Sequence, residues 1–67
     1  MNWRRISQSV RVSECGTYEL RSAYTDTGFA WRGRVVQTDE LVASSADRQF
    51  VMGRCEAHAL TVAAESA

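Results

Sequence analysis

The chain has 67 residues, a formal net charge of zero and 45% hydrophobic residues. A chain of this length forms one domain (residues 1–67) with a small core. It lacks both the roughly 20 consecutive apolar residues of a membrane span and the apolar segment of a signal peptide, so we expect a cytoplasmic protein without a membrane partner.

The first expected strand covers residues 3–13. Val10 and Val12 alternate with Arg11, and such period-two alternation is typical of a half-buried strand. We expect the two valines to face the core and Arg11 to face outward.

The clearest elements are two strands at 17–25 and 28–37, joined by the turn sequence "TDTG". Asp and Gly suit a tight turn between alternating strands. Pairing Tyr24 with Phe29 places every aromatic residue of this hairpin on one face, whereas a slip by one residue would mix the two faces. The residues expected on the aromatic face are Tyr18, Leu20, Ser22, Tyr24, Phe29, Trp31, Gly33 and Val35.

A helix is expected over residues 45–65, where Ser44 and Asp47 have the spacing of a capping box. Its apolar stripe should cover the aromatic face of the sheet, as a small sheet requires for stability. The stripe consists of Val51, Met52, Cys55, Ala59 and Val62. The expected fold class is therefore α+β: a three-stranded antiparallel β-meander with one C-terminal α-helix packed on one face.

The expected helix has a second apolar zone roughly opposite the first stripe, formed by Phe50, Ala57 and Leu60, with Gly53. Either Phe50 covers the sheet edge near Leu41 and Val42, or the zone contacts a partner, such as a second copy in a homodimer.

Charge is unevenly distributed. Residues 1–35 hold six arginines and three acidic residues, a net charge of +3, whereas residues 36–67 hold two arginines and five acidic residues, a net charge of −3. In the expected register Arg21 faces Arg32, a repulsive pair, and Glu19 faces Arg34, an attractive pair.

The sheet face away from the helix is then an arginine face. Its expected residues are Arg11, Arg21, Arg32, Arg34 and Glu19. Arginine binds carboxylates, phosphates and guanine edges, so this face predicts a protein or nucleic-acid contact. A face that is simply solvated remains the alternative.

Cys55 and His58 lie three residues apart on the expected helix. A zinc site needs four ligands, and a nucleophilic thiol needs exposure and an oxyanion site. We therefore expect no metal, no cofactor and no catalysis. Cys15 and Cys55 are expected to be free thiols in a reducing compartment, with a disulfide between them left open.

Two family resemblances follow from these residues. Three strands followed by a helix, with "AWRGRVV" at 30–36, resemble the ethylene-response and phage-integrase arm-binding domains, which implies DNA recognition by the sheet. "CEAHA" at 55–59 and the early tryptophan resemble small stand-alone proteins of phages and mobile elements. The other residues that carry this second resemblance are Trp3, Tyr18, Leu20, Gly28 and Trp31. That class includes anti-CRISPR proteins, which inhibit host nucleases by binding their protein subunits.

We therefore expect a non-enzymatic inhibitor in the host cytoplasm, docked on a host protein complex that handles nucleic acid. The arginine face is one expected contact, and the helix supplies the other through Phe50, Leu60, Asp47 and Glu56. The alternatives are a nucleic-acid-binding module that uses the arginine face, and a structural or adaptor subunit.

Overall fold

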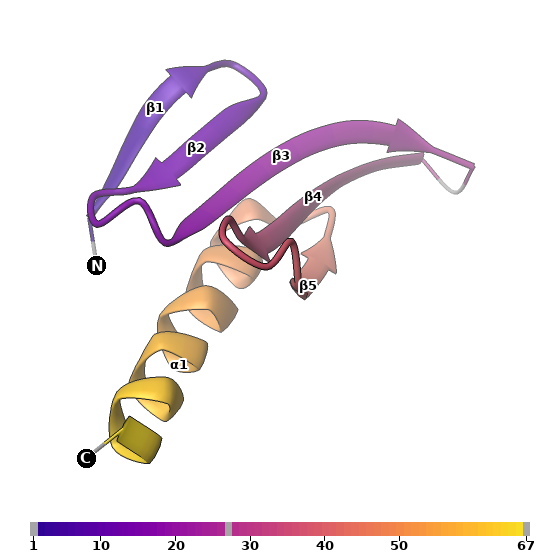
Figure 1. Ribbon diagram of the computed structural model, residues 1–67. Helices are drawn as coiled ribbons and strands as arrows, with labels where there is room; N and C mark the ends of the chain where they lie inside the picture. The colour runs from indigo at the N-terminus through magenta and orange to yellow at the C-terminus, as the bar shows by residue number, and fades with distance from the viewer. Residues whose placement is uncertain (1, 27, 67) are drawn as a thin grey trace.

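The computed structural model describes residues 2–26 and 28–66. It is an α+β fold: one antiparallel sheet of five strands in the order β1-β2-β3-β4-β5, followed by one C-terminal helix (Figure 1). The elements are β1 (Trp3–Ser7), β2 (Val10–Ser13), β3 (Tyr18–Thr25), β4 (Gly28–Val35), β5 (Leu41–Ser45) and α1 (Arg48–Ser66). The expected antiparallel meander and C-terminal helix are present, but the predicted number of strands was wrong, because the sheet has five strands and not three.

The expected strand at 3–13 is a hairpin of two strands, β1 and β2, with a turn at Gln8 and Ser9. This turn lacks the Gly, Asn or Asp that usually marks a hairpin in sequence. The Oγ of Ser7 accepts a hydrogen bond from the Ser9 amide at 3.2 Å, and the side chain of Arg11 donates to the Ser7 carbonyl at 2.6 Å. Side chains therefore replace the usual turn residues.

The fifth strand, β5, was also missed, and the expected strand at 28–37 ends at Val35. A short loop reverses the chain, with Asp39 at a φ of 60°, a conformation that Asp tolerates better than most residues. The sequence "LVASS" that follows is short, and its serines favoured a helix start. In fact the helix begins at Arg48: Asp47 is its cap and accepts from the Gln49 amide at 2.9 Å.

The β3–β4 pairing confirms the predicted register. Tyr24 pairs with Phe29, and Leu20 pairs with Gly33. Thr27, in the predicted turn, lies outside the described residues. The register holds because only this pairing keeps the large apolar side chains on one face.

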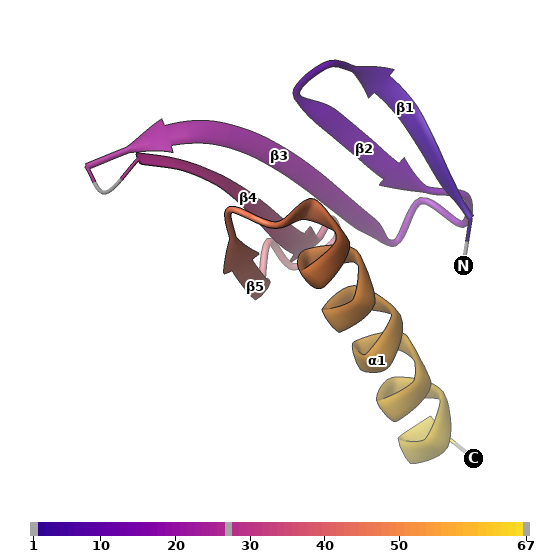
Figure 2. The same cartoon turned by 180° about the vertical axis from the view of Figure 1, so that it is seen from behind.

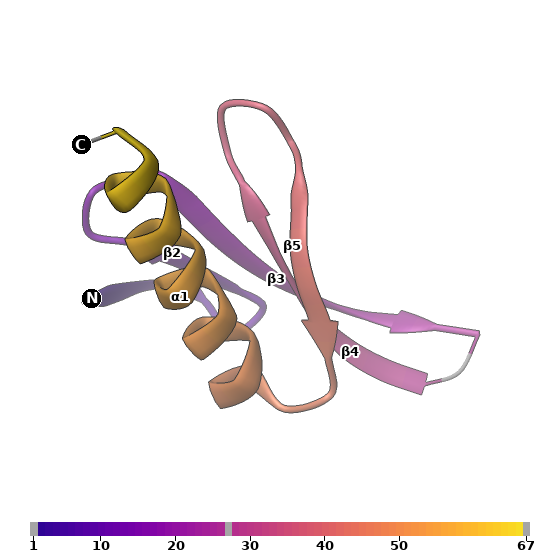
Figure 3. The same ribbon diagram turned by 90° about the horizontal axis from the view of Figure 1, so that it is seen from below.

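The helix packs against β3, β4 and β5 (Figures 1 and 2). Its closest approach to the sheet is at Gly33, beside Leu20. The buried core consists of Tyr18, Leu20, Trp31, Val51 and Cys55, with Met52 and Ala59 packed against it. The predicted helix stripe is thus confirmed except at Val62, which is exposed. In the view from below, α1 and β5 lie side by side (Figure 3).

Two hairpins extend beyond this core. The β3–β4 hairpin curves away from the helix to a free tip, and the β1–β2 hairpin rises on the other side (Figure 1). The molecule is elongated accordingly, with extents of 40 × 22 × 20 Å. Within the described residues, no helix has the length and apolar character needed to cross a membrane.

The facing of β2 is the reverse of the prediction. Arg11 pairs with Leu20, and Val12 pairs with Glu19. Directly paired residues project to the same side of a sheet, so Arg11 lies on the helix side and the two valines lie on the open face. The prediction failed because α1 does not reach over β2, so nothing there favours burying the valines inward.

Candidate functional site

The face of the sheet away from α1, here called the open face, holds three of the four predicted arginines. Arg21 and Arg32 are cross-strand partners, and Glu19 faces Arg34 as predicted. Arg11 is absent from this face because of the reversed facing of β2. The open face is therefore less basic than the sequence suggested.

Ion pairs neutralise much of the open face. Oε1 of Glu19 accepts from Arg21 Nε at 2.6 Å and from Arg34 Nη2 at 2.8 Å. Arg34 Nη1 also donates to Oδ1 of Asp39 at 2.6 Å. Arg32 is exposed, and among the described residues its side chain has neither an ion pair nor a hydrogen bond.

These contacts shift the pKa values of the paired groups. Partial burial raises the pKa of the Glu19 carboxyl, but hydrogen bonds and charge from Arg21 and Arg34 outweigh burial, so the pKa lies below its usual value. The hydrogen bond to Glu19 is the main reason that the pKa of Arg34 is raised. A phosphate or carboxylate ligand would have to displace these internal partners.

A second basic group lies on the helix side of the sheet, around Trp31. We call Arg5, Arg11 and Arg48 the arginine cluster. Arg5 and Arg11 are cross-strand partners. The guanidinium carbons of Arg11 and Arg48 lie 5.5 and 5.7 Å from the centroid of the Trp31 ring, which is within cation–π range.

Arg11 is the fixed member of the cluster. Its Nη1 donates to the carbonyl oxygens of Ser7, Gln8 and Val10, at 2.6, 3.4 and 3.3 Å. Desolvation and the positive charges of Arg48 and Arg5 lower the pKa of its guanidinium. The guanidinium nevertheless remains charged at physiological pH.

Three aromatic rings continue this surface toward the hairpin tip. We call Tyr24, Phe29 and Trp31 the aromatic ladder. Tyr24 and Phe29 contact edge to face with centroids 5.6 Å apart, and Phe29 contacts Trp31 in the same way at 6.0 Å. Exposure rises along the ladder from 7% for Trp31 to 42% for Phe29 and 87% for Tyr24.

Sequence reasoning assigned the ladder to the core and did not select Arg5 or Arg48. The sequence did contain a signal for the ladder. Tyr24 and Phe29 flank the turn between two strands that are each eight residues long. A single helix packed at Leu20 does not cover strands of that length. Arg5 had no readable signal, because its partner depends on the turn between β1 and β2.

The predicted helix contacts differ in their surroundings. Asp47 caps α1, whereas Glu56 accepts a hydrogen bond from the Trp3 indole at 3.4 Å. Phe50 and Leu60 are 53% and 73% exposed. Phe50 therefore leaves about half of its surface in solvent rather than sealing the sheet edge.

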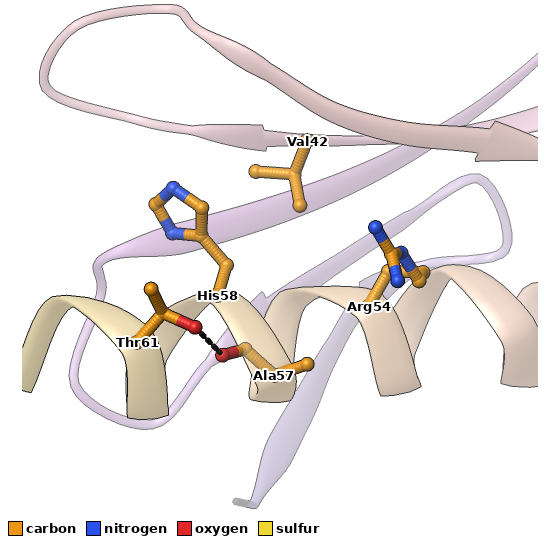
Figure 4. Close-up of a pocket in the computed structure, with 5 residues that line it drawn as sticks. All are labelled: Val42, Arg54, Ala57, His58 and Thr61. Carbon is orange, nitrogen blue, oxygen red and sulfur yellow. Dashed lines mark hydrogen bonds between the residues drawn. The ribbon is translucent and has the colours of Figure 1, made fainter. Parts of the chain in front are cut away.

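A small pocket of about 220 Å³ lies between α1 and β5 (Figure 4). Its lining residues are Val42, Arg54, Ala57, His58 and Thr61. His58 is engaged at its Nδ1, which lies 2.7 Å from the hydroxyl of Tyr18. Part of the polar lining of the pocket therefore already hydrogen-bonds within the protein.

Both cysteines are free thiols. Burial raises the pKa of the Cys55 thiol to about 11. Hydrogen bonds with Ser13 and Thr17 lower the pKa of the exposed Cys15 thiol to about 7. Within the described part of the chain, no three His, Cys, Asp or Glu residues come together as a metal site.

Comparison with known proteins gave no match to a protein-family model, to a curated protein or to a solved structure.

Proposed function

We propose that this protein is a non-enzymatic binding protein that docks on another protein through the tip of the β3–β4 hairpin. The observation that carries the proposal is the exposed aromatic pair at the tip, where 87% of Tyr24 is exposed while its ring is held against Phe29. Tyrosine, tryptophan and arginine are the residues most enriched at the energetic centres of protein interfaces. A pre-ordered ring also loses little entropy on binding.

We further propose that the partner is a host complex that handles nucleic acid, and that docking inhibits it in the host cytoplasm. This setting comes from the resemblance to small phage proteins. Direct nucleic-acid binding through the open face is the rival. The pairing of Arg21 and Arg34 with acidic residues weakens that rival, because each paired charge is already compensated.

The exposed residues Phe50 and Leu60 on α1 are the proposed second contact, either with the partner or with another copy of the chain. Sedimentation at increasing concentration distinguishes the two uses. If the chain stays monomeric, this zone contacts a different protein or solvent. If the chain forms a dimer that dissociates when Phe50→Ser is introduced, the zone is a self-association contact.

The test is capture from a nuclease-treated bacterial lysate, followed by purification of the captured protein and a direct titration. Three baits are compared: the natural chain, Tyr24→Ser with Phe29→Ser, and Arg32→Ser as an exposed control. We expect the natural chain and Arg32→Ser to bind the purified partner, the tip variant to lose binding, and the partner's nucleic-acid activity to fall at one equivalent.

Two results contradict the proposal. One is binding of the purified partner that survives both tip substitutions. The other is a direct shift of DNA or RNA by the chain alone, with an affinity that falls with a log–log salt slope of about −0.9 per phosphate contact. Circular dichroism of each bait establishes that the variants are folded.

A further inference from the structure

The arginine cluster is a concentration of positive charge without internal compensation. Arg5 and Arg11 face each other across β1 and β2, and Arg11 and Arg48 share the ring of Trp31. Among residues 2–26 and 28–66, no carboxylate lies within ion-pair distance of any of these three side chains. Like charges held together destabilise a fold, and a bound anionic group would offset that repulsion.

The cluster is continuous with the aromatic ladder. Trp31 contacts two of the arginines and also Phe29, and Phe29 in turn contacts the exposed Tyr24. The cluster and ladder residues of the strands all lie on the helix side of the sheet, and Arg48 reaches Trp31 from the start of α1. The β3–β4 hairpin, whose outer end carries Phe29 and Tyr24, extends past the helix (Figures 1 and 2). The surface therefore offers charge at one end and exposed aromatic area at the other.

We propose that this surface binds an acidic segment of the partner protein, with Asp or Glu carboxylates between Arg5 and Arg48 and apolar side chains against Phe29 and Tyr24. The inference rests on the proposed function and specifies the chemistry of the partner. Arginine forms short, charge-assisted hydrogen bonds to carboxylates. The guanidinium of Arg11 is held by its hydrogen bond to the Ser7 carbonyl, so it contributes positive charge without having to move.

The geometry of the rings favours a peptide over a nucleic-acid strand. Single-stranded nucleic acid binds by stacking successive bases on exposed ring faces. Trp31 is only 7% exposed, and the two guanidinium groups lie on it. Phe29 and Tyr24 meet at 65°, so they do not form parallel platforms.

The probe for this surface is the fluorescence of Trp31 in a Trp3→Phe background, which leaves one tryptophan. Three ligands are titrated at low salt: a short peptide of repeating Glu-Glu-Leu units, a matched Gln-Gln-Leu peptide, and oligo-dT of similar length. We expect a saturable change with the glutamate peptide, weak or no change with the other two, and weakening as salt is added.

The variants Arg5→Gln and Arg48→Gln should each lower the affinity for the glutamate peptide roughly tenfold to a hundredfold, which is the size expected for the loss of one charge-assisted hydrogen bond. Arg32→Gln, on the open face, is the matched control and should bind as the parent does. Urea unfolding of each variant shows whether it is folded under the titration conditions.

The inference is overturned if the glutamine peptide binds as well as the glutamate peptide, if oligo-dT binds more tightly, or if Arg32→Gln weakens binding as much as Arg48→Gln. Failure here is separable from failure of the proposed function. If a captured partner requires Tyr24 and Phe29 but still binds Arg5→Gln and Arg48→Gln, the proposed docking function stands and the proposal of an acidic segment is wrong.

Discussion

Gly33 on β4 lies directly against Val51 on α1. A Cβ atom added at Gly33 would be 2.7 Å from Cγ1 of Val51 and 2.8 Å from Sγ of Cys55. Real Cβ atoms do not approach other heavy atoms this closely, so these two side chains or the helix that carries them would have to move. The absence of a side chain at Gly33 therefore sets how closely α1 packs on the sheet.

We expect Gly33→Ala to lower the free energy of unfolding by about 1–3 kcal/mol, because it overpacks the centre of the core. Urea unfolding followed by circular dichroism measures the change. Gly53→Ala is the matched control: nothing lies within 4 Å of a Cβ atom there, and Ala in a helix interior is more stable than Gly by about 0.5–1 kcal/mol. If both variants change stability in the same direction, this account of the packing is wrong.

Arg11 is expected to stabilise the fold although the sequence placed it at the surface. Arg11→Gln removes the contact with the Trp31 ring and the hydrogen bonds to the turn between β1 and β2, and we expect a loss of about 1–2 kcal/mol. Arg32→Gln, which has no such contacts within the described chain, should stay within about 0.5 kcal/mol of the parent. Equal losses in the two variants would contradict the reversed facing of β2.

The ion pairs of Glu19 predict a pH-dependent stability. Its folded-state pKa is lowered, so the stabilisation is fully present above the unfolded pKa of about 4.3 and is lost as pH falls through the folded-state value. The difference in unfolding free energy between the parent and Glu19→Gln should be constant from neutral pH to about pH 5 and shrink below it. A difference that persists unchanged into strong acid would show that charge is not its source.

The two thiols should differ sharply in reactivity. With a pKa of about 7, Cys15 is about half ionised at neutral pH. Iodoacetamide should modify it with a rate midpoint near that pH. The buried Cys55, with a pKa of about 11, should react only on unfolding, and mass spectrometry of digested protein assigns each adduct.

Thr17→Val removes the hydroxyl that accepts a hydrogen bond from the Cys15 thiol at 3.3 Å, and it should move the rate midpoint of Cys15 upward. Because the folded-state pKa of Cys15 is below the usual thiol pKa of 9.0, its thiolate stabilises the fold above pH 9.0, and this contribution is lost as pH falls through about 7. A midpoint unmoved by Thr17→Val would assign the shift to another cause.

The sequence predicted the parts of the fold that local patterning determines. The β3–β4 register followed from the alternation of Tyr18, Leu20, Trp31 and their neighbours, because only one pairing keeps them together. The core face of the helix followed from its spacing, with Val51 and Cys55 fully buried.

The missed parts depend on context that the sequence does not carry locally. The turn at Gln8 and Ser9 is held by side chains, and β5 is held by its pairing with β4. Arg11 has the same local alternation whether it faces in or out, so only the reach of the helix decides its side. The candidate surface was missed for this reason, since Arg5 and Arg48 gather only around a correctly placed Arg11.

The two halves of the β3–β4 hairpin have different surroundings. Its inner half, around Leu20 and Gly33, holds the helix, while its outer half, at Tyr24 and Phe29, projects past it. Mutations at the tip therefore leave the residues that hold the fold untouched. Under the proposed docking role, recognition and folding therefore depend on separate positions of one hairpin, so substitutions at Tyr24 and Phe29 are expected to change partner choice without loss of the fold.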